Sequence, residues 1–344
     1  MFKFKNIQFN KLKKIFLIAE CGINHNGNYK LAKRLVIAAK LAGFDAVKFQ
    51  TYITENLVHK STKLAKYQLK TNYKTQFEML KKYSLKKEEF IKLKKFCDKI
   101  KIIFLSTPFD LESAKFLDKI INVPVFKISS ADLNNYQILN YIKASKKPII
   151  LSTGMSTKKM LKKTISFLNY PKSKIAVLHC VSEYPTDIKN SYLGSLNKLK
   201  KNFYHGLSDH TANEHTAAAA SVMGIKILEK HITISRNMNG PDHNASLPIK
   251  ELNSFVKLIR DLEYSSKQIK FRPTKEELRN FSVVNRKIFF KEDMIKGSKI
   301  NFENILPLRS NFKNAISNNE LLNIIGKKIK KNVKKLSPIK KYLV

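Results

Sequence analysis

Short apolar runs alternate with amphipathic stretches along the first three quarters of the chain. Eight runs have the length of a buried strand, and the stretches between them carry apolar residues at helical spacing. Eight strand-helix units in about 260 residues predict an α/β fold of the (β/α)8 TIM-barrel type. A doubly wound open sheet is the alternative, but no GxGxxG motif follows the first run. The predicted strands are Phe16–Cys21, Ala46–Thr51, Ile102–Thr107, Val125–Ser129, Pro148–Thr153, Ile175–Cys180, Tyr204–Asp209 and Ile227–Ile232.

The pattern changes after the eighth predicted helix, which runs from Pro248 to about Ser265. The segment KQIKFRPTKEELRN reads as a linker, and short β-type runs around a glycine turn begin at Phe281. These features predict a basic N-terminal tail (1–14), a barrel domain (15–270), a linker (271–280) and a small β-rich domain (281–344). The Lys-rich end of the last domain, residues 327–344, is predicted to be frayed.

Polar residues begin where each apolar run stops. In a parallel barrel the carboxyl ends of all strands meet at one face, which is where barrel active sites are built. Random surface polarity would not start at these positions in run after run, so we predict one shared site. The residues at the predicted strand ends are Glu20, Lys48 and Gln50, Thr107, Lys127 with Ser129 and Ser130, Ser152 with Thr153, His179, Ser208 with Asp209 and His210, and Glu229 with His231.

Glu229 and His231 are separated by one residue at the end of the last predicted strand, so their side chains leave the same face. His210 ends the preceding strand, and Glu20 ends the first. Carboxylates and imidazoles that share one space can bind a divalent metal or move a proton. A single histidine is more often a core or surface residue whose ring nitrogens are hydrogen-bonded within the protein. The pair at two consecutive strand ends favours a site for a metal or for proton transfer.

A second group of residues at the predicted strand ends is cationic and rich in hydrogen-bond donors. Lys48 and Lys127 lie within apolar strands, where an unpaired charge is costly, so an anionic partner is expected. With the hydroxyls at neighbouring strand ends, they form a set suited to a phosphate and a carboxylate. Those hydroxyl residues are Thr107, Ser130, Ser152 and Ser208.

The chain has 66 Lys and Arg against 26 Asp and Glu, a net charge of +40. Nearly all of the excess is lysine and is spread over every segment, whereas nucleic-acid readers favour clustered arginine with interleaved aromatics, so no specific nucleic-acid partner is predicted. The three cysteines form no CxxC motif, and no disulfide framework is indicated. No apolar run approaches the length of a membrane span, and the basic start lacks the features of a signal peptide; we expect a cytoplasmic protein.

Taken in order, the motifs IAECGINHNG, VKFQTY, FLSTPFD, FKISSAD, ILSTGM, LHCVSEYPT, GLSDHT, ILEKHIT and GPDHNASL resemble those of the sialic acid synthase family. This family comprises the N-acetylneuraminate synthases and related bacterial nonulosonate synthases. The resemblance covers about residues 15–330. The small domain, with KEDMIKG and ENI, is similar to the antifreeze-protein-like (SAF) domain that these synthases carry at the carboxyl end.

The resemblance implies condensation of phosphoenolpyruvate with an N-acetylmannosamine-type aldehyde and water, with release of phosphate. His210 and His231 would hold a divalent metal, Mn or Mg, that polarises the aldehyde. Glu20 would be a positioned base or an anchor for a sugar hydroxyl, and Glu229 would orient the metal's water. The residues implied to bind phosphoenolpyruvate are Lys48, Thr107, Lys127, Ser130, Ser152 and Ser208.

For the sugar, the resemblance implies contacts from Gln50, Tyr184 and Asp242, with Asn72 joining them from the long loop after the second strand. Arg309 would reach the sugar of a partner subunit, which implies a homodimer in which the small domain caps the neighbour's barrel.

Three positions depart from the family pattern and bear on which sugar is used. Ser182 stands where the family often has Asn, and Ser129 and Asp132 replace a Gly and a Glu. The segment LRSNFKNAIS around Arg309 lacks the Pro and Gly of the family's loop. The acceptor is therefore either N-acetylmannosamine or a diacetamido sugar, as for legionaminic or pseudaminic acid.

Rival functions remain open at this stage. A class I aldolase would use Lys127 to form a Schiff base with pyruvate, but it has no need for the two histidines. A barrel retained as a non-catalytic scaffold and a basic protein associated with nucleic acid are further alternatives. The intact strand-end residues disfavour the scaffold, and the dispersed lysines disfavour the nucleic-acid protein.

Overall fold

A computed structural model describes residues 9–267 and 271–344 of the chain. The chain divides into two compact units, Met1–Gln268 and Ile269–Val344. Each unit has an apolar core of its own.

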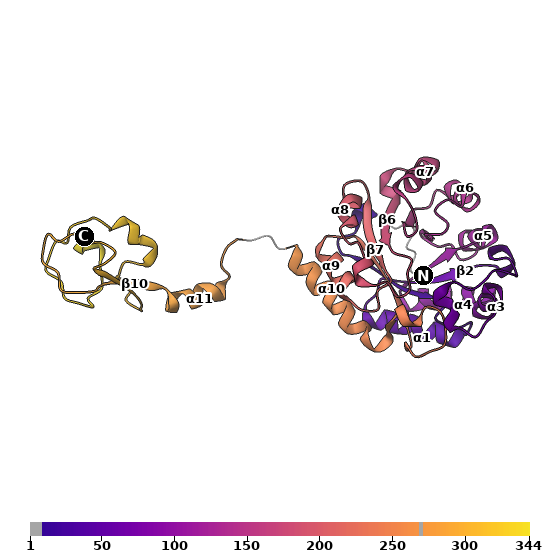
Figure 1. Ribbon diagram of the computed structural model, residues 1–344, viewed down its shortest axis with the longest axis horizontal. Coiled ribbons are helices and arrows are strands. Elements are labelled where there is room, and N and C mark those ends of the chain that lie inside the picture. The colour runs from indigo at the N-terminus through magenta and orange to yellow at the C-terminus, as the bar shows by residue number, and fades with distance from the viewer. Residues whose placement is uncertain (1–8, 268–270) are drawn as a thin grey trace. The chain divides into compact units, whose positions relative to one another are not determined.

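The first unit is built on eight parallel strands that form a nearly closed barrel (Figure 1). The last strand pairs with the first, so the open-sheet alternative is wrong. The two strands at the ends of the hydrogen-bonded order, β3 and β4, lie next to each other. The strands are β1 (Phe16–Gly22), β2 (Ala46–Thr51), β3 (Ile103–Pro108), β4 (Phe126–Ile128), β5 (Ile149–Ser152), β6 (Ile175–Cys180), β7 (Tyr204–Asp209) and β8 (Ile227–Thr233), with the short β9 (Leu247–Pro248) beside β8.

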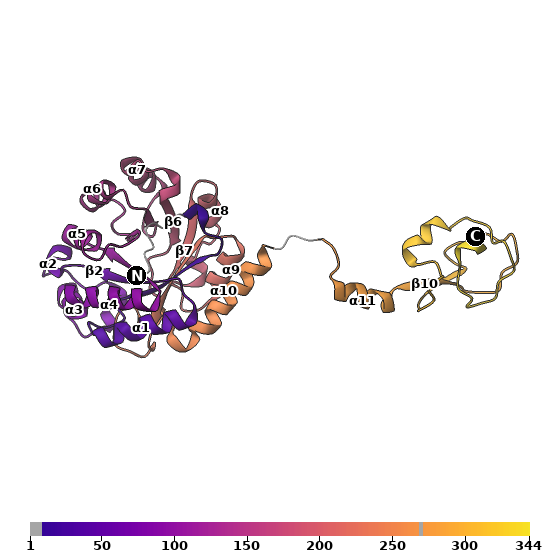
Figure 2. The ribbon, with the colours of Figure 1, turned by 180° about the vertical axis from the view of Figure 1, so that it is seen from behind.

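Helices surround this barrel, as the views from the two opposite sides show (Figures 1 and 2). The long helix predicted at the end of the barrel is present and begins at Leu252. The helices are α1 (Tyr29–Ala42), α2 (Thr54–Leu57), α3 (Gln76–Tyr83), α4 (Lys87–Ile100), α5 (Leu111–Lys119), α6 (Tyr136–Ser145), α7 (Lys158–Leu168), α8 (Ser195–Lys200), α9 (His215–Val222) and α10 (Leu252–Ser266). Single turns of 3-10 helix are η1 (Phe9–Lys11), η2 (Lys66–Lys70), η3 (Lys172–Lys174), η4 (Ile188–Asn190), η5 (His243–Ala245) and η6 (Ile249–Glu251).

Local chemistry sets the ends of these helices. The side chain of Asn28 accepts hydrogen bonds from the first backbone N–H groups of α1, and Gly43 ends the helix in the left-handed conformation with φ of 93°. Asp110 caps α5 in the same way by accepting from the N–H of Ser113. These caps place each helix directly after the strand whose carboxyl end carries the polar residues.

Alternation along the strands divides the barrel interior into two levels. Side chains that point inward are apolar in the amino-terminal half of the strands, where they form a buried cluster closed by Phe9 of η1. Further along the same inward faces, the apolar residues give way to the polar residues of the predicted site. In β1, for example, Phe16 and Ile18 belong to the buried cluster, and Glu20 lies at the upper level.

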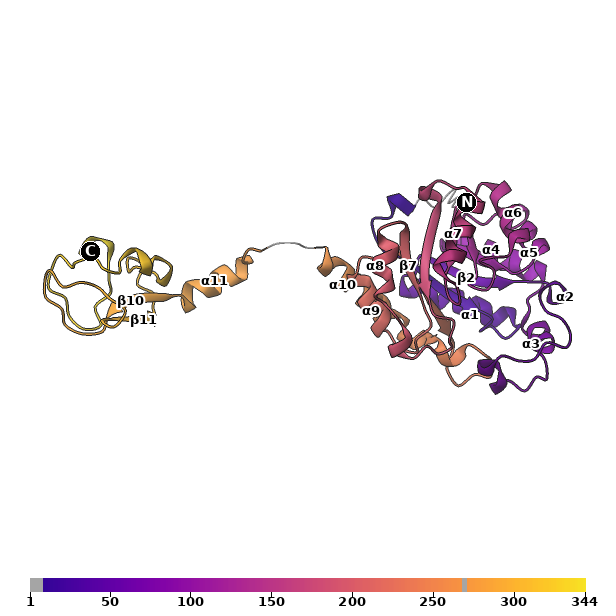
Figure 3. The same ribbon diagram turned by 45° about the horizontal axis from the view of Figure 1, so that its top comes forward.

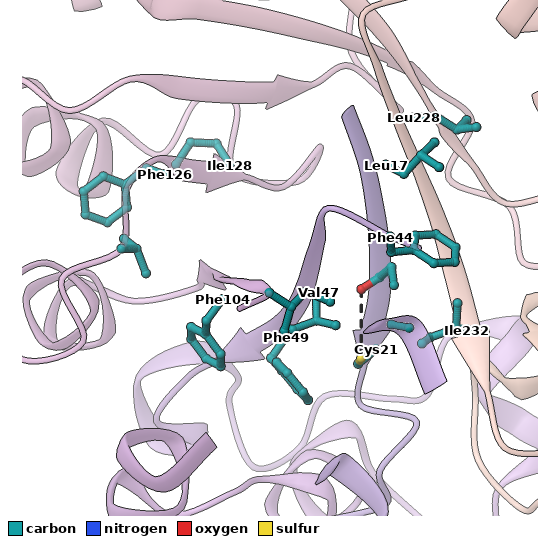
Figure 4. Close-up of a cluster of buried hydrophobic side chains, with 14 of the residues drawn as sticks. Leu17, Cys21, Phe44, Val47, Phe49, Phe104, Phe126, Ile128, Leu228 and Ile232 are labelled. Atoms are coloured by element: carbon teal, nitrogen blue, oxygen red, sulfur yellow. Dashed lines mark hydrogen bonds between the residues drawn. The ribbon is translucent and has the colours of Figure 1, made fainter. Parts of the chain in front are cut away.

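The outward faces of the strands pack against the helices and form the main core. Leu17 and Cys21 of β1, Val47 and Phe49 of β2, and Phe104 of β3 belong to it (Figure 4). The rings of Phe49 and Phe104 stack with centroids 5.6 Å apart. This continuous apolar layer fixes the strands against the helices, and the carboxyl-terminal edge is left free for function.

The second unit is small and contains one antiparallel pair, β10 (Arg286–Phe290) and β11 (Ile305–Arg309), which lie side by side in Figure 3. It also holds α11 (Lys275–Val284) and the turns η7 (Asn318–Asn323) and η8 (Lys341–Leu343). Isolated bridges join further segments to the pair, including one between Phe289 and Pro338. Within residues 271–344 the architecture is therefore irregular and β-rich around a compact core.

One sequence-based expectation for this unit needs correction. Residues 327–344 are not frayed, because Ile329, Val333 and Ile339 are buried in the core of the unit. The region predicted as a linker, 271–280, contains the start of α11. Thr274 and Glu277 form a reciprocal capping box there, a signal that was present in the sequence TKEE.

Candidate active site

A cavity of about 350 Å³ opens at the carboxyl ends of the barrel strands. Its volume falls in the range of small-molecule sites. Most of the predicted site residues line it together, although they come from seven different strands and from the loops after β4, β6 and β7. These residues are Glu20, Lys48, Gln50, Thr107, Lys127, Ser130, Ser152, Tyr184, Ser208, His210, Glu229 and His231.

Of the predicted strand-end residues, Thr153, His179 and Asp209 do not line this cavity, and of the residues implied by the resemblance Asn72, Asp242 and Arg309 do not. Asn72 is exposed on the segment after β2, and Arg309 is exposed at the end of β11 in the second unit. Asp242 is buried just outside the residues that line the cavity. The strand-end rule could not place Asn72, because the path of a long loop is not set by strand register.

Gly22 explains how Asp242 comes close to the site. Its φ is +50°, and a Cβ added there would lie 3.3 Å from Glu20 Oε1, 3.4 Å from His231 Cε1 and 3.6 Å from Asp242 Oδ2. The left-handed backbone at this position favours glycine, and an added Cβ would be tight against Glu20 alone.

Two lysines and two glutamates form a buried ionic cluster at the base of the cavity. Lys48 forms a salt bridge with Glu20, and its Nζ lies 3.6 Å from Glu229 Oε2. Lys127 Nζ lies 3.4 Å from Glu229 Oε1. The expected division into a cationic half and a carboxylate half is therefore wrong. Each buried ammonium group lies beside a carboxylate, since an isolated buried charge would be too costly.

The two glutamates titrate in opposite directions. Burial raises the pKa of Glu20 to about 7, although Lys48 contacts it and acts in the other direction. Burial also opposes ionisation of Glu229, but Lys127 and Lys48 together lower its pKa to about 2. Ser208 Oγ adds a hydrogen bond of 2.8 Å to Glu229 Oε1. Neighbouring carboxyl groups with separated pKa values can divide the roles of proton carrier and fixed negative charge.

The hydroxyl groups surround this cluster, and one of them lacks a hydrogen-bond partner. Lys48 Nζ donates to Thr107 Oγ1 at 3.2 Å. The buried Ser152 Oγ has no hydrogen-bond partner, whereas Glu20 Oε2 is engaged by the salt bridge with Lys48. Buried polar atoms without partners are rare in proteins, and at a cavity they mark positions where a polar ligand would bind.

His210 and His231 face each other across the cavity edge, with ring centroids 5.3 Å apart. His210 Nδ1 lies 2.7 Å from the carbonyl oxygen of Val181, which assigns the proton to Nδ1 and leaves Nε2 as the free lone pair. His231 Nδ1 is buried without a partner. Burial, with His210 and Lys48, lowers the pKa of His231 well below its usual range, so this imidazole is neutral. A neutral imidazole with an unpartnered nitrogen is the form that binds a metal ion.

Among residues 9–267 and 271–344, no group of three or more His, Cys, Asp or Glu side chains is arranged to hold a metal ion. His210 and His231 are the side chains at the cavity that would hold an ion, with its other positions left to water and substrate. The other histidines of the last two barrel strands and of the segments after them do not line the cavity. His243, for example, is held by Thr233 and Asn26.

Several lining residues were not predicted. Cys180 ends β6 with its Sγ 3.6 Å from Ser130 Oγ and 3.8 Å from His210 Nδ1. Burial opposes its ionisation, but His210 lowers the pKa of its thiol to about 7. Its position at a strand end was the signal that could have identified it.

The other unpredicted residues belong to the segments between the strands. Tyr67 of η2 lies against Tyr184 with ring centroids 5.1 Å apart, and Tyr184 in turn lies 4.2 Å from the ring of His210. The remaining lining residues are Leu57, Val58, Gln76, Leu80, Phe109, Ser129, Ala131, Asp132, Met155 and Ser182, of which Ser129 was predicted from its strand end and Asp132 and Ser182 as positions that bear on the sugar. Ser129 and Asp132 also bond to each other, with Ser129 Oγ donating to Asp132 Oδ2 at 2.5 Å.

The fold and the cavity together define a (β/α)8-barrel protein with a charged small-molecule site at its strand ends. The model of the NeuB family matches residues 35–270. The N,N'-diacetyllegionaminic acid synthase of Campylobacter jejuni is 36% identical over 330 residues, which cover 94% of this chain and 98% of that protein. The pseudaminic acid synthase of the same species is 30% identical, with 95% of each chain covered.

Among solved structures, the N-acetylneuraminic acid (sialic acid) synthetase from Leptospira borgpetersenii superposes with a TM-score of 0.69 at 31% identity. The match covers 78% of this chain and 90% of that one. The chain thus belongs to the NeuB family of sialic acid and related nonulosonate synthases, and the resemblance drawn from its motifs is confirmed. No helix within the described parts of the chain is long and apolar enough to cross a membrane.

Proposed function

We propose that the protein condenses phosphoenolpyruvate with an acetamido sugar and water, and releases phosphate. The observation that carries this proposal is the buried cluster of Lys48, Lys127, Glu20 and Glu229 at the base of a cavity in a NeuB-family barrel. Two ammonium groups and several hydroxyls suit a ligand that bears both a phosphate and a carboxylate. Two carboxyl groups with separated pKa values suit chemistry that moves a proton near a developing charge.

Phosphoenolpyruvate would lie over the lysines. Its anionic groups would take the places that the carboxylates of Glu20 and Glu229 only partly fill, and would provide the unpartnered Ser152 Oγ with an acceptor. Because the lysines are buried, each contact with an anion is stronger than it would be in water. The residues in this role are Lys48, Thr107, Lys127, Ser130, Ser152 and Ser208.

In the reaction, C3 of phosphoenolpyruvate attacks the aldehyde carbon of the sugar and positive charge develops at C2. Glu229, which stays ionised because its pKa is low, would stabilise that charge and orient water. Glu20, whose pKa is raised to about 7, would accept the proton of the water that adds at C2 or anchor a sugar hydroxyl. Departure of phosphate from C2 then leaves the keto group of the product.

A divalent metal, Mn or Mg, would be held by His210 and His231. When bound there, it would supply Lewis-acid polarisation of the sugar aldehyde. The protein's own contribution is to hold two imidazoles at the cavity edge, one of them fixed by the Val181 carbonyl and the other kept neutral by burial.

The acceptor would contact Gln50 and Tyr184, with Asp242 supporting from behind the wall. Two kinds of acceptor are in question: N-acetylmannosamine, and a diacetamido sugar of the legionaminic or pseudaminic acid type. The 36% identity to N,N'-diacetyllegionaminic acid synthase over nearly the whole chain supports the diacetamido sugar at least as well. Asn72 would contribute only if its loop moved when the sugar binds.

The second unit would be an SAF-type domain, and Arg309 on β11 would reach the sugar in the barrel of a second subunit. The working form would then be a homodimer, and the site of action would be the cytoplasm, where phosphoenolpyruvate is made.

The proposal is tested by incubating the protein with phosphoenolpyruvate, Mn and either sugar, and identifying the product by mass spectrometry. A product with the mass of the sugar plus that of pyruvate supports the condensation. The aldolase alternative predicts instead that borohydride traps a pyruvate adduct on Lys127. A trapped adduct, with no dependence on phosphoenolpyruvate, would overturn the proposal.

A further inference from the structure

Lys230 is a buried lysine on the outward face of the last barrel strand. It lies between Glu229 and His231 on β8, but its side chain leaves the opposite face of the strand. It has no exposed surface, and Leu228 and Ile232 on the same outward face belong to the main core (Figure 4). A buried ion pair is often no more stabilising than the apolar side chains that could replace it. The apolar core by itself therefore gives no reason for a lysine at this position.

The ammonium group of Lys230 holds together the turn at the end of β7. Its Nζ lies 2.8 Å from Asp209 Oδ2, and it donates to the carbonyl oxygens of Thr211 at 2.6 Å and Asn213 at 2.7 Å. These bonds use the three N–H groups of the ammonium. Asp209 Oδ1 in turn accepts from the N–H of Thr211 at 3.0 Å. One side chain of β8 thus fixes both ends of the turn 209–213.

His210 lies inside this turn, and its ring lines the cavity. The loop after β6 contacts it twice. Its Nδ1 is bonded to the Val181 carbonyl, and its own carbonyl oxygen accepts from the N–H of Thr186 at 2.9 Å. Lys230 holds the backbone on the other side. The orientation of the imidazole in the cavity therefore depends on both sets of contacts.

Arg236 brings a second cation to the same turn. It follows β8, and its Nη2 donates to the carbonyl oxygen of Ala212 at 2.8 Å. Its Nε donates to the carbonyl oxygen of Ser246 at 3.1 Å. Together with Lys230, it takes the carbonyl oxygens of three consecutive residues of the turn. A turn held in this way cannot rotate without breaking charge-assisted hydrogen bonds, which are stronger than neutral ones.

We propose that Lys230 is a positioning residue: it fixes the turn after β7 so that His210 keeps the orientation in which its Nε2 can bind the metal. This inference rests on the proposed function, in which His210 and His231 hold that metal. Lys230 does not line the cavity, and its hydrogen bonds go to Asp209 and to the backbone of the turn, so it acts through that backbone. Three consecutive residues of β8 then serve the site, Glu229 and His231 directly and Lys230 from behind.

Lys230→Met tests this role, because it keeps an unbranched apolar stem and removes the three donors. The measurement is Mn affinity, taken from the electron paramagnetic resonance signal of free Mn, and it needs no turnover. Affinity is expected to weaken by at least 10-fold, the scale found for residues that orient a metal ligand. The Mn concentration for half-maximal phosphate release should rise by the same factor, and the KM for phosphoenolpyruvate should stay nearly unchanged.

Lys147→Met is the matched control. Lys147 also forms a salt bridge with an aspartate, with its Nζ 2.9 Å from Asp118 Oδ1, and it donates to Asn122 Oδ1 at 2.9 Å. It precedes β5, at the amino-terminal end of the barrel strands and away from the cavity. Both variants lose a lysine that is paired with an aspartate, so both are expected to have a lower Tm. The loss of Mn affinity should occur only in Lys230→Met.

Arg236→Met is a second variant of the same turn. It removes the bond to the Ala212 carbonyl from a half-buried side chain, so it is expected to fold even if Lys230→Met does not. Because the bonds of Lys230 remain, the loss of Mn affinity should be smaller, about 3-fold to 10-fold.

Wild-type Mn affinity in folded Lys230→Met would overturn the positioning role and leave the condensation intact. If that variant does not fold, wild-type affinity in Arg236→Met has the same meaning. Equal losses of affinity in Lys230→Met and Lys147→Met would also overturn the role, because they would reflect a general loss of stability. A wild-type protein that binds no Mn would overturn it as well. Absence of phosphate release with every acetamido sugar would instead overturn the proposed function, and the role of Lys230 with it.

Discussion

At the scale of single residues, the site shows how one cluster gives two carboxyl groups opposite properties. Glu20 and Glu229 both lie near Lys48, but Lys127 lies beside Glu229. The second ammonium group keeps Glu229 ionised, while burial prevails at Glu20. Near pH 7, Glu229 therefore carries a permanent negative charge and Glu20 carries an exchangeable proton.

Titration of Glu20 makes stability depend on pH. Its pKa is about 7 in the folded protein and about 4.3 when unfolded, so between these values the folded state binds more protons. The free energy of unfolding should then fall as pH rises through this window. Glu20→Gln removes that contribution and should reduce the fall by roughly 1–3 kcal/mol. Urea unfolding of both proteins at pH 4.5 and 7.5 measures the fall in the free energy of unfolding between these pH values. An equal fall in the two proteins would contradict the raised pKa of Glu20.

His231 tests the metal assignment. Its side chain lies at a strand end on the cavity, and its Nδ1 bonds to no other group. His231→Ala should therefore abolish metal-dependent turnover, by at least 100-fold, with a shift in Tm of only a few degrees. Steady-state assays with and without Mn, beside thermal unfolding, separate the two effects. Normal turnover in the variant would remove His231 from the metal site.

At the scale of elements, the sequence pattern predicted the barrel well. Ala46–Thr51, Ile175–Cys180 and Tyr204–Asp209 have the same bounds in the structure, because buried parallel strands are continuous apolar runs with sharp polar ends. The same feature identified most of the site. Tyr67, Leu57 and Leu80 were missed, because residues between the strands are positioned by tertiary packing and not by strand period.

The second unit was predicted less well for a similar reason. Ile329, Val333 and Ile339 are buried one by one among lysines, without the alternation of a regular strand. Their segments join the unit through isolated bridges between distant residues, such as Met294 with Val333. Non-local pairing of this kind leaves no period in the sequence, so the segment read as a charged tail.

The close pairing of β7 with β8 in the barrel depends on Gly206. A Cβ at this position would lie 2.2 Å from the carbonyl oxygen of Ile227 and 2.6 Å from Leu178 Cδ2. Gly206→Ala should therefore destabilise the fold by about 2–4 kcal/mol, because backbone must move. Gly194→Ala is the control: nothing lies within 4 Å of the added Cβ, and a change of about 0.5 kcal/mol or less is expected. Equal stabilities of the two variants in urea unfolding would refute the claim that the pairing of β7 with β8 requires Gly206.

At the scale of the whole molecule, two units with separate cores allow their roles to be separated by truncation. Removal of residues 269–344 should leave the barrel folded and the KM for phosphoenolpyruvate nearly unchanged. The KM for the sugar should rise by at least 10-fold if the second unit caps the site of a partner subunit. Kinetics in both substrates, with sedimentation to follow the dimer, measure this. An unchanged KM for the sugar would exclude the capping role.

The central claim concerns the chemistry of the cavity, and phosphate release from phosphoenolpyruvate tests it most directly. The measurement is made with acetamido sugar and Mn, without sugar, and with a chelator added. The account predicts phosphate only when sugar and metal are both present. A folded, metal-loaded protein that releases no phosphate with N-acetylmannosamine or with a diacetamido sugar would contradict it.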